Sequence, residues 1–495
     1  MKFKKYILIG LSVVSLASCK KSFLNDVAPA NGTVSEALIF NSKVGVDNAM
    51  TGIYNRLRNY QYTGSAQNMS GVKTIQFNFD MRGNDLISDA SNWWLYENNW
   101  SDNNYGRIAT ATRNAQIWNL FYQVINNANA IIKNTPTISE SDAVKTAFIA
   151  EARALRGYAY FNLARVYQFT YAKDTNAPGV PISLDPTTAT TTGKPRSSMK
   201  DVYAQITSDL EYATANLPVT RVDKYRINKN VAQGILAEVY QEMAMADNTL
   251  WSKVVTNAQA ARSGFPLMSA ADYRSGFNSV AVNEWMWGLQ FNASQSLSYA
   301  SFFGYIEPLN TPNTSFTARY NDIYVNNTFV NLFSTTDVRN LFLPAKNQTT
   351  ALTWKKWVTT KFQDNATKSG DYVMMRSSEM YLMEAEADAQ LGQLELAKDV
   401  LLTLQKARDL NAVRSAAATK DALIAEILVE RGKELYGEIG VQYFDLKRYQ
   451  QPLVRDGIQW SMLNIQPTDN RWRWQLPQTE MDSNTSLKPT DQNPL

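Results

Sequence analysis

The chain has 495 residues, of which 44% are hydrophobic and 19% are charged, a balance typical of a globular protein with a large core. Lys and Arg exceed Asp and Glu by only 49 − 45 = +4, which excludes the strong positive charge of a nucleic-acid-binding protein. The chain has no histidine and one cysteine, which excludes histidine-dependent triads, histidine-ligated zinc, an internal disulfide and cysteine metal clusters. Any catalysis would therefore depend on carboxylates, and we expect no enzyme activity and no cofactor.

Residues 1–18 have the pattern of an export signal. Three lysines precede the apolar run Tyr6–Leu16, whose 11 residues are too few to cross a bilayer as a helix. The sole cysteine follows in Leu16-Ala17-Ser18-Cys19, which resembles a bacterial lipobox. The resemblance implies cleavage before Cys19 and attachment of lipid to its thiol, with enough acyl chains for stable anchoring. An ordinary secreted protein with a chance cysteine at this position is the alternative.

Helical periodicity runs through most of the remaining chain. We expect helices over residues 48–58, 112–133, 141–167, 199–216, 229–246, 377–390, 394–408 and 421–436. Between the helices predicted at 229–246 and 377–390, residues 265–375 form an insertion rich in Asn, Ser, Thr and aromatics. A buried strand is predicted there around Trp285 and Trp287. Small residues on either side of Gly392 are typical of a tetratricopeptide helix pair.

The predicted fold class is mainly α, a tetratricopeptide-type helical repeat scaffold with long irregular loop insertions and a few short strands. The expected organisation is a signal peptide at 1–18, a lipidated cysteine and tether at 19–42, and a single domain at 43–495. Within that domain the helical repeats should cover about 111–264 and 376–450.

The segment 91–105, SNWWLYENNWSDNNY, is rich in the side chains that bind sugars. It holds three tryptophans, two tyrosines and five asparagines. Aromatic rings stack on the apolar faces of sugars, and Asn both donates to and accepts from hydroxyls. We expect a binding site formed by Trp93, Trp94, Tyr96, Asn98, Trp100 and Tyr105. Because two adjacent tryptophans on a loop cannot point the same way, one of Trp93 and Trp94 should lie in the core or at the rim.

A second aromatic segment, Tyr299–Tyr305, lies on the long insertion. Its candidates for ligand binding are Phe303 and Tyr305, with a packing role equally open.

Seven further segments carry motifs in a fixed order along the chain. They are Ala150–Phe161 (AEARALRGYAYF), Arg196–Leu210, Arg226–Tyr240, Arg376–Ala387 (RSSEMYLMEAEA), Glu430–Glu438 (ERGKELYGE), Tyr443–Arg448 (YFDLKR) and Leu476–Pro494. Together, behind a lipobox, they resemble the SusD/RagB-like outer-membrane lipoproteins of Bacteroidota, which implies a SusD-like fold. Their repeated charges, such as Glu384 and Glu386 beside Arg376, or Glu430, Arg431 and Glu434 on one helix, indicate ion pairs between helices rather than catalysis.

The resemblance also implies a function. A member of this family would be anchored in the outer membrane by lipid alone, facing the exterior, and would pass a captured oligosaccharide to a SusC-like TonB-dependent transporter. A peptide-binding RagB-like member and, less favoured, a glycoside hydrolase are the alternatives. Lys20-Lys21 departs from the acidic start of surface-export signals, which leaves the exterior orientation open. Asp- and Asn-rich loops are compatible with structural Ca²⁺.

Overall fold

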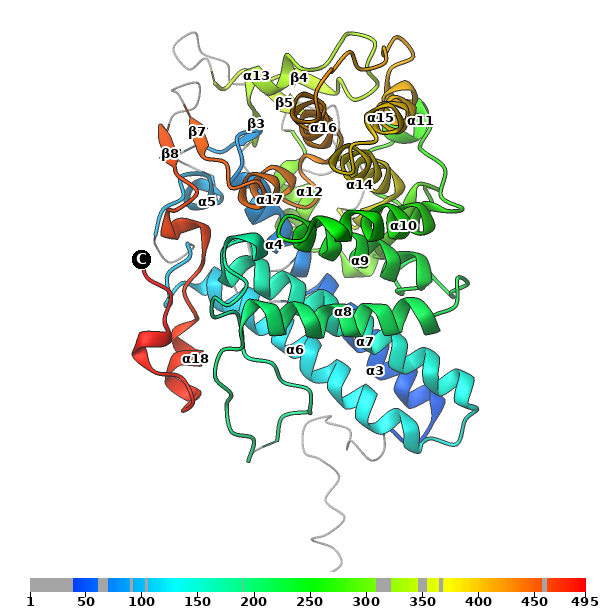
Figure 1. Ribbon diagram of the computed structural model, residues 1–495, viewed down its shortest axis with the longest axis vertical. Helices are drawn as coiled ribbons and strands as arrows, with labels where there is room; N and C mark the ends of the chain where they lie inside the picture. Colours follow the sequence, from blue (N-terminus) through cyan, green and yellow to red (C-terminus); the bar gives the residue numbers. More distant parts are fainter. Residues whose placement is uncertain are drawn as a thin grey trace, which may run out of the picture.

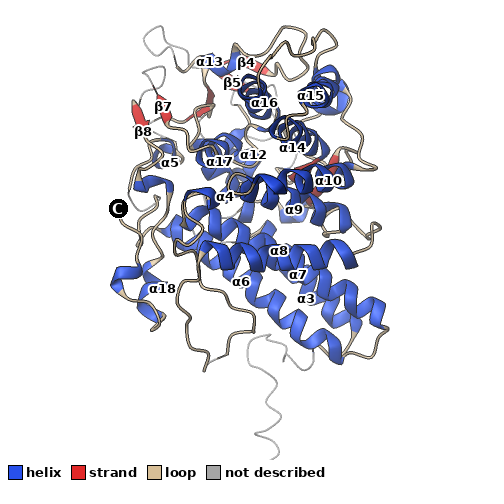
Figure 2. Cartoon of the chain, in the orientation of Figure 1, coloured by secondary structure: helices blue, strands red, loops and turns tan. Residues whose placement is uncertain are grey.

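Helices make up most of the computed structural model (Figures 1 and 2). The structure describes residues 39–60, 70–89, 92–102, 106–188, 190–308, 322–345, 354–364, 368–455 and 461–495. Cys19 and Tyr105 lie outside these ranges. No helix among the described residues is both long enough and apolar enough to cross a membrane.

The first group of helices runs from the lower part of the view in Figure 1, where α3, α6, α7 and α8 lie, up to its middle, where α9 and α10 lie. It consists of α3 (Lys43–Arg58), α6 (Thr112–Asn134), α7 (Asp142–Tyr167), α8 (Met199–Asn216), α9 (Lys229–Ala244) and α10 (Trp251–Arg262). Each of α6 to α10 packs against its neighbour in sequence. The side chains of Ser141, Ser198 and Asn228 accept hydrogen bonds from first-turn N–H groups, which explains why α7, α8 and α9 begin where they do.

The second group contains the predicted tetratricopeptide-like pair. Its members are α14 (Ser377–Gln390), α15 (Leu394–Arg408), α16 (Lys420–Leu435) and α17 (Val441–Arg448). Gly392, with φ +78°, ends α14 in a left-handed turn. The N–H of Gln393 donates to the C=O of Asp388 at 2.8 Å and that of Gly392 to Ala389 at 3.1 Å, which is the Schellman arrangement that glycine favours. Because α10 packs against α14, the two groups form one continuous stack.

The insertion between the groups is closed at its base by two paired strands. β2 (Trp285–Leu289) runs antiparallel to β6 (Tyr372–Arg376), and both strands are buried, as predicted for Trp285 and Trp287. Beyond this base lie α12 (Phe302–Ile306), α13 (Asn327–Val330), β3 (Tyr324–Val325), β4 (Phe342–Pro344) and β5 (Trp357–Thr359). With β1 (Leu86–Ile87), the last three strands form an antiparallel sheet in the order β1-β3-β5-β4.

Short elements complete the chain. They are α4 (Gly71–Met81), α5 (Leu95–Asn98), α11 (Ala270–Tyr273), the hairpin β7 (Leu453–Arg455) with β8 (Leu463–Ile465), and α18 (Gln478–Ser483).

Buried ion pairs join the helices, which confirms the structural interpretation of the charged motifs. Glu434 on α16 receives hydrogen bonds from Arg376 at 2.7 Å, from Arg408 at 2.9 Å and from Arg339 at 3.1 Å. The partners of two other acids differ from the expectation: Glu384 pairs with Arg262 of α10, and Glu386 pairs with Arg448 of α17, rather than either with Arg376. These pairs therefore connect α14 to neighbouring helices.

Candidate functional site

The predicted aromatic segment folds as a turn that leads into α5. The side-chain oxygen of Asn92 accepts a hydrogen bond from the backbone N–H of Trp94 at 3.0 Å, and its backbone C=O accepts one from Leu95 at 3.3 Å. This turn places the two adjacent tryptophans in different surroundings, because Trp94 is fully buried while Trp93 is half-buried. The prediction that one of the two belongs to the core is confirmed.

Trp94 packs inside the molecule. Its ring meets Phe77 of α4 edge to face at 4.8 Å between centroids, lies 5.2 Å from Tyr305, and has the Arg113 guanidinium 4.9 Å from its centroid. This burial corrects the expectation that Trp94 faces a ligand.

Asn98 and Trp100 are also interior residues, which corrects their assignment to the site. Asn98 donates to the carbonyls of Met81 at 2.8 Å and Leu86 at 3.0 Å, so its amide joins α4 to β1. Trp100 donates its indole N–H to the carbonyl of Arg82 at 2.8 Å and packs edge to face on Trp472 at 4.8 Å. The N–H groups of both side chains donate to backbone carbonyls, so they are not available to bind a sugar.

The second segment is corrected in the same way. Phe303 and Tyr305 lie on α12, whose residues are all buried, and the Tyr305 ring packs against Phe77 at 5.3 Å. Phe303 and Tyr305 lie about 200° apart around the helix axis, so both rings are buried because the core surrounds the whole of this short helix.

Among the described residues of the two segments, three aromatic side chains reach the surface: Trp93, Tyr96 and Tyr299. Trp93 and Tyr299 are in contact, and we call this pair the aromatic rim. Tyr96 is 37% exposed and Tyr299 is 46% exposed. The Trp93 and Tyr299 rings meet at 5.9 Å between centroids with an interplanar angle of 63°. The rim therefore joins the two segments that the sequence singled out, 206 residues apart in the chain, at one place on the surface.

Tyr299 is held in place by the turns around it. It lies on the 3₁₀ turn Ser298–Ala300, and Ser298 adopts a left-handed φ of +55°. The carbonyl of Ala300 accepts a hydrogen bond from the Ser70 hydroxyl at 3.1 Å, and Ser301 caps α12 by accepting from Gly304 at 2.9 Å. A ring fixed by its backbone in this way loses little conformational entropy when a ligand binds.

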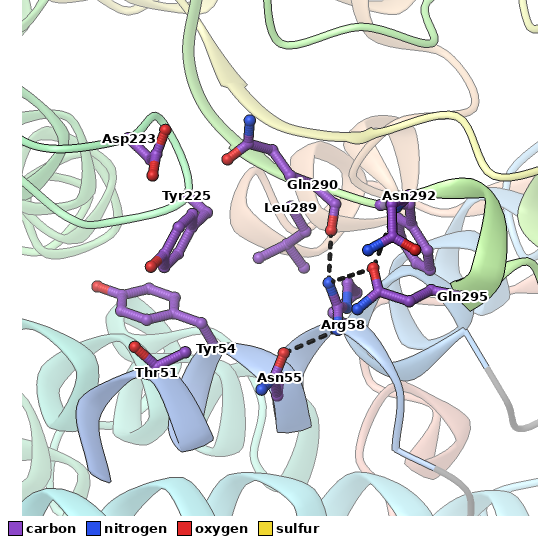
Figure 3. Close-up of a pocket in the computed structure, with 11 residues that line it drawn as sticks. Thr51, Tyr54, Asn55, Arg58, Asp223, Tyr225, Leu289, Gln290, Asn292 and Gln295 are labelled. Atoms are coloured by element: carbon purple, nitrogen blue, oxygen red, sulfur yellow. Dashed lines mark hydrogen bonds between the residues drawn. The ribbon is translucent and has the colours of Figure 1, made fainter. Parts of the chain in front are cut away.

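A polar cavity of about 340 Å³ lies beside the segment that carries Tyr299 (Figure 3). It is lined by α3, by the loop between α8 and α9, and by the chain that leaves β2; the lining residues are Thr51, Tyr54, Asn55, Arg58, Asp223, Tyr225, Leu289, Gln290, Phe291, Asn292 and Gln295. Burial lowers the pKa of the Arg58 guanidinium from its usual value. The volume falls within the range of small-molecule sites.

A larger groove of about 470 Å³ lies between α6, the loop 181–194 and α18. Its floor contains Trp118 and Tyr122, with ring centroids 4.6 Å apart. Its amides are engaged within the protein: Asn129 donates to Ser183 at 3.0 Å, and Asn126 accepts from Thr187 at 2.7 Å. These hydrogen bonds hold the Pro- and Thr-rich loop against α6.

Carboxylates are not arranged for glycoside hydrolysis at these surfaces. The polar cavity has one lining carboxylate, Asp223, and the larger groove has one, Glu480, whereas hydrolysis requires a pair. Four acids do line a third cavity, but its volume of about 30 Å³ suits a water molecule rather than a sugar. Within the described ranges, no three His, Cys, Asp or Glu side chains are grouped to hold a metal ion.

Comparison with known proteins identifies the family. Residues 234–495 match the profile of the SusD family, and residues 23–241 match a related profile described as starch-binding associating with outer membrane. The chain belongs to the SusD family. Proteins of the SusD family are binding proteins rather than enzymes, and the recognised motifs, the fold class and the non-catalytic character predicted from the sequence are thereby confirmed.

Individual SusD-like proteins match over different lengths. A SusD-like protein of Bacteroides ovatus is 30% identical over 239 residues, which is 48% of this chain and 39% of that protein. SusD-like protein P38 of Formosa agariphila is 33% identical over 145 residues, or 28% of this chain and 26% of that protein. These alignments thus span well under half of either relative.

Solved structures match over nearly the whole chain. The SusD-like carbohydrate-binding protein of Bacteroides vulgatus has a TM-score of 0.78 at 26% identity and covers 92% of this chain and 99% of that chain. A SusD superfamily protein of Bacteroides thetaiotaomicron has a TM-score of 0.74 at 24% identity, over 92% and 100% of the two chains. The latter likeness shows the SusD fold.

Sequence reasoning on this SusD-family chain missed the cavity residues. Arg58 ends a helix, Asp223 lies on an unremarked loop, and Gln290 follows a buried strand, so no local pattern links them. Tyr299 stood at the edge of a predicted segment, but its contact with Trp93 depends on tertiary structure.

Proposed function

We propose that this chain is a lipid-anchored outer-membrane protein that captures oligosaccharides at the aromatic rim and delivers them to a SusC-like TonB-dependent transporter. The observation that carries the proposal is the contact between the half-buried Trp93 and the exposed Tyr299, two rings brought together from distant segments. Angled rings of this kind offer apolar faces to the C–H surfaces of a sugar chain.

The relatives support the ligand class and the location. The Bacteroides vulgatus protein is named as carbohydrate-binding, and one matching family profile is described as starch-binding and associated with the outer membrane. The lipobox at Cys19 would supply the attachment to that membrane, and the transporter partner follows from the family resemblance.

Binding to a panel of neutral oligosaccharides, measured by isothermal titration calorimetry, tests the proposal. We expect Trp93→Ala and Tyr299→Ala each to weaken the binding of the best ligand roughly tenfold, because each removes a stacking surface. Tyr381→Ala is the matched control, since it removes a half-buried ring from α14, away from the rim. Equal affinities in wild type and both rim variants would contradict this site.

The same panel separates the alternatives. A peptide-binding member would bind oligopeptides in preference to every glycan, and a hydrolase would release shorter sugars from them. Either result would replace the proposed function.

A further inference from the structure

The polar cavity places an uncompensated positive charge in a partly buried position. Arg58 Nη1 donates to the carbonyl of Gln290 at 2.7 Å and to the side chain of Gln295 at 3.0 Å, and Nη2 donates to Asn55 at 2.8 Å (Figure 3). All three acceptors are neutral. Arg58 forms no ion pair with any carboxylate of the described residues, and the Phe291 ring covers it at 5.2 Å.

Two further cations, Arg221 and Lys224, lie on the loop that carries Asp223, outside the cavity lining. Arg221 donates to the carbonyls of Arg226 and Met286, and Lys224 donates to the carbonyl of Val282 at 2.7 Å. Neither has a carboxylate partner among the described residues, and burial lowers the pKa of both. The cavity lining itself contains one cation, Arg58, and one acid, Asp223.

The opposite end of the cavity suits a sugar ring. Tyr225 is half-buried and packs edge to face on the buried Tyr54, with ring centroids 5.4 Å apart. Figure 3 shows the pair across the cavity from Arg58, with Leu289 between the pair and Arg58. The exposed carboxylate of Asp223 lies beside Tyr225 and can accept hydrogen bonds from hydroxyls. Thr51 and the amides of Gln290 and Asn292 supply further polar contacts.

From these contacts we propose that the cavity is a subsite for a sugar unit that carries a carboxylate, a uronic acid, held by Arg58. A carboxylate seated here would gain charge-assisted hydrogen bonds in a partly desolvated place. The hydroxyl-binding amides favour a sugar over an amino acid. The inference rests on the proposed function only for its carbohydrate ligand, because the cavity shares no residue with the aromatic rim.

The cavity and the rim are close enough for one glycan to reach both. Gln295 lines the cavity and Tyr299 belongs to the rim, so they lie four positions apart in the chain and their Cα atoms are at most about 14 Å apart. An acidic oligosaccharide could place a uronate in the cavity and a neighbouring unit against Trp93.

The test compares a uronate-containing oligosaccharide with its carboxyl-reduced, neutral counterpart by isothermal titration calorimetry on the full mature chain. We expect wild type to bind the acidic ligand at least tenfold more tightly, and Arg58→Gln to abolish that preference. Arg58→Lys, which keeps the charge, should retain part of it. Arg56→Gln is the matched control, because Arg56 is exposed on the same turn of α3 and removes the same charge outside the cavity.

Circular dichroism and melting temperature establish that Arg58→Gln is folded, and the neutral ligand provides a second measure of binding.

Equal binding of acidic and neutral ligands by wild type would overturn the uronate subsite while leaving the rim proposal intact. A preference that survives in Arg58→Gln but is lost in Trp93→Ala would also overturn it. Loss of acidic binding in Arg58→Gln alone, with no effect of Trp93→Ala, would instead refute the rim. Tighter Arg58-dependent binding of a free dipeptide would replace the sugar by a zwitterionic ligand.

Discussion

Trp93, Trp94 and Trp100 show how one short segment divides its aromatic rings between surface and core. A turn at Asn92 and the left-handed φ of +54° at Trp100 rotate the successive side chains into different surroundings. Trp100 needs this conformation to bring its indole N–H to the carbonyl of Arg82 and its ring onto Trp472. The interactions of the Trp100 ring therefore stabilise the fold, whereas the Trp93 ring lies where a ligand can reach it.

Replacing Trp100 tests this division. We expect Trp100→Ala to lower the free energy of unfolding by about 3–5 kcal/mol, because it leaves a cavity between α4 and the C-terminal segment. Urea denaturation measures the loss. Trp93→Ala should cost much less stability, and a Trp100→Ala protein as stable as wild type would show that the ring is not part of the core.

Composition located the aromatic segment, but it could not assign each ring. The five asparagines indicated a surface loop, yet Asn98 turns inward to satisfy backbone carbonyls of α4 and β1. Nothing in the local sequence distinguishes this Asn from one that binds a ligand, because its partners are supplied by other parts of the chain. The same holds for Phe303 and Tyr305 on α12.

The long helices could be predicted because their apolar residues repeat with the helical period and polar caps mark their starts. Met199–Asn216, Ser377–Gln390 and Leu394–Arg408 agree with prediction at both ends. By contrast, α4 had no such pattern, since every one of its residues is buried, including charged ones. Lys73 donates to the carbonyl of Glu438 at 2.7 Å, and Asp80 accepts from the N–H of Gly437 at 3.1 Å, so these two charged side chains bind backbone groups from distant parts of the chain.

Glu434 joins α16 to the end of β6, to α15 and to the loop that carries Arg339. Replacing it with Gln would remove one of the two carboxylates that the buried Arg376 and Arg408 share, and would leave them Glu284. We expect Glu434→Gln to lower the free energy of unfolding by about 3–5 kcal/mol, the cost of breaking a buried ion pair. Glu395→Gln, which removes a solvent-exposed partner of Arg414, should leave the urea midpoint unchanged. Equal midpoints for both variants would contradict the role of Glu434.

The same network predicts an acid limit. The arginines around Glu434 and the pair of Arg376 and Lys361 at Glu438 hold the pKa of both carboxyls below the ordinary value of 4.5. Their stabilisation is complete above that value and is lost as the pH falls through the lower, folded pKa values. We expect the urea midpoint to fall as the pH decreases below about 4.5, and the fall should be shallower in Glu434→Gln. A parallel dependence in the two proteins would refute this assignment.

At the scale of the whole molecule, the proposed anchor can be tested apart from the ligand. Cys19 is the only cysteine, so Cys19→Ser removes every thiol to which lipid could attach. We expect the wild-type protein to enter the detergent phase of a Triton X-114 separation and Cys19→Ser to remain in the aqueous phase. Recovery of both proteins in the aqueous phase would show an unlipidated secreted protein.

The β2–β6 ladder has a consequence for how such a chain acquires new specificities. The segment 290–371 begins directly after β2 and ends at β6. Because β2 and β6 are paired and α10 packs against α14, this segment leaves and rejoins the helical scaffold at one place. A changed sequence within this segment would still begin and end on the same paired strands. The β2–β6 pairing therefore fixes where the excursion begins and ends, and a substitution at the exposed Tyr299 leaves that pairing unchanged.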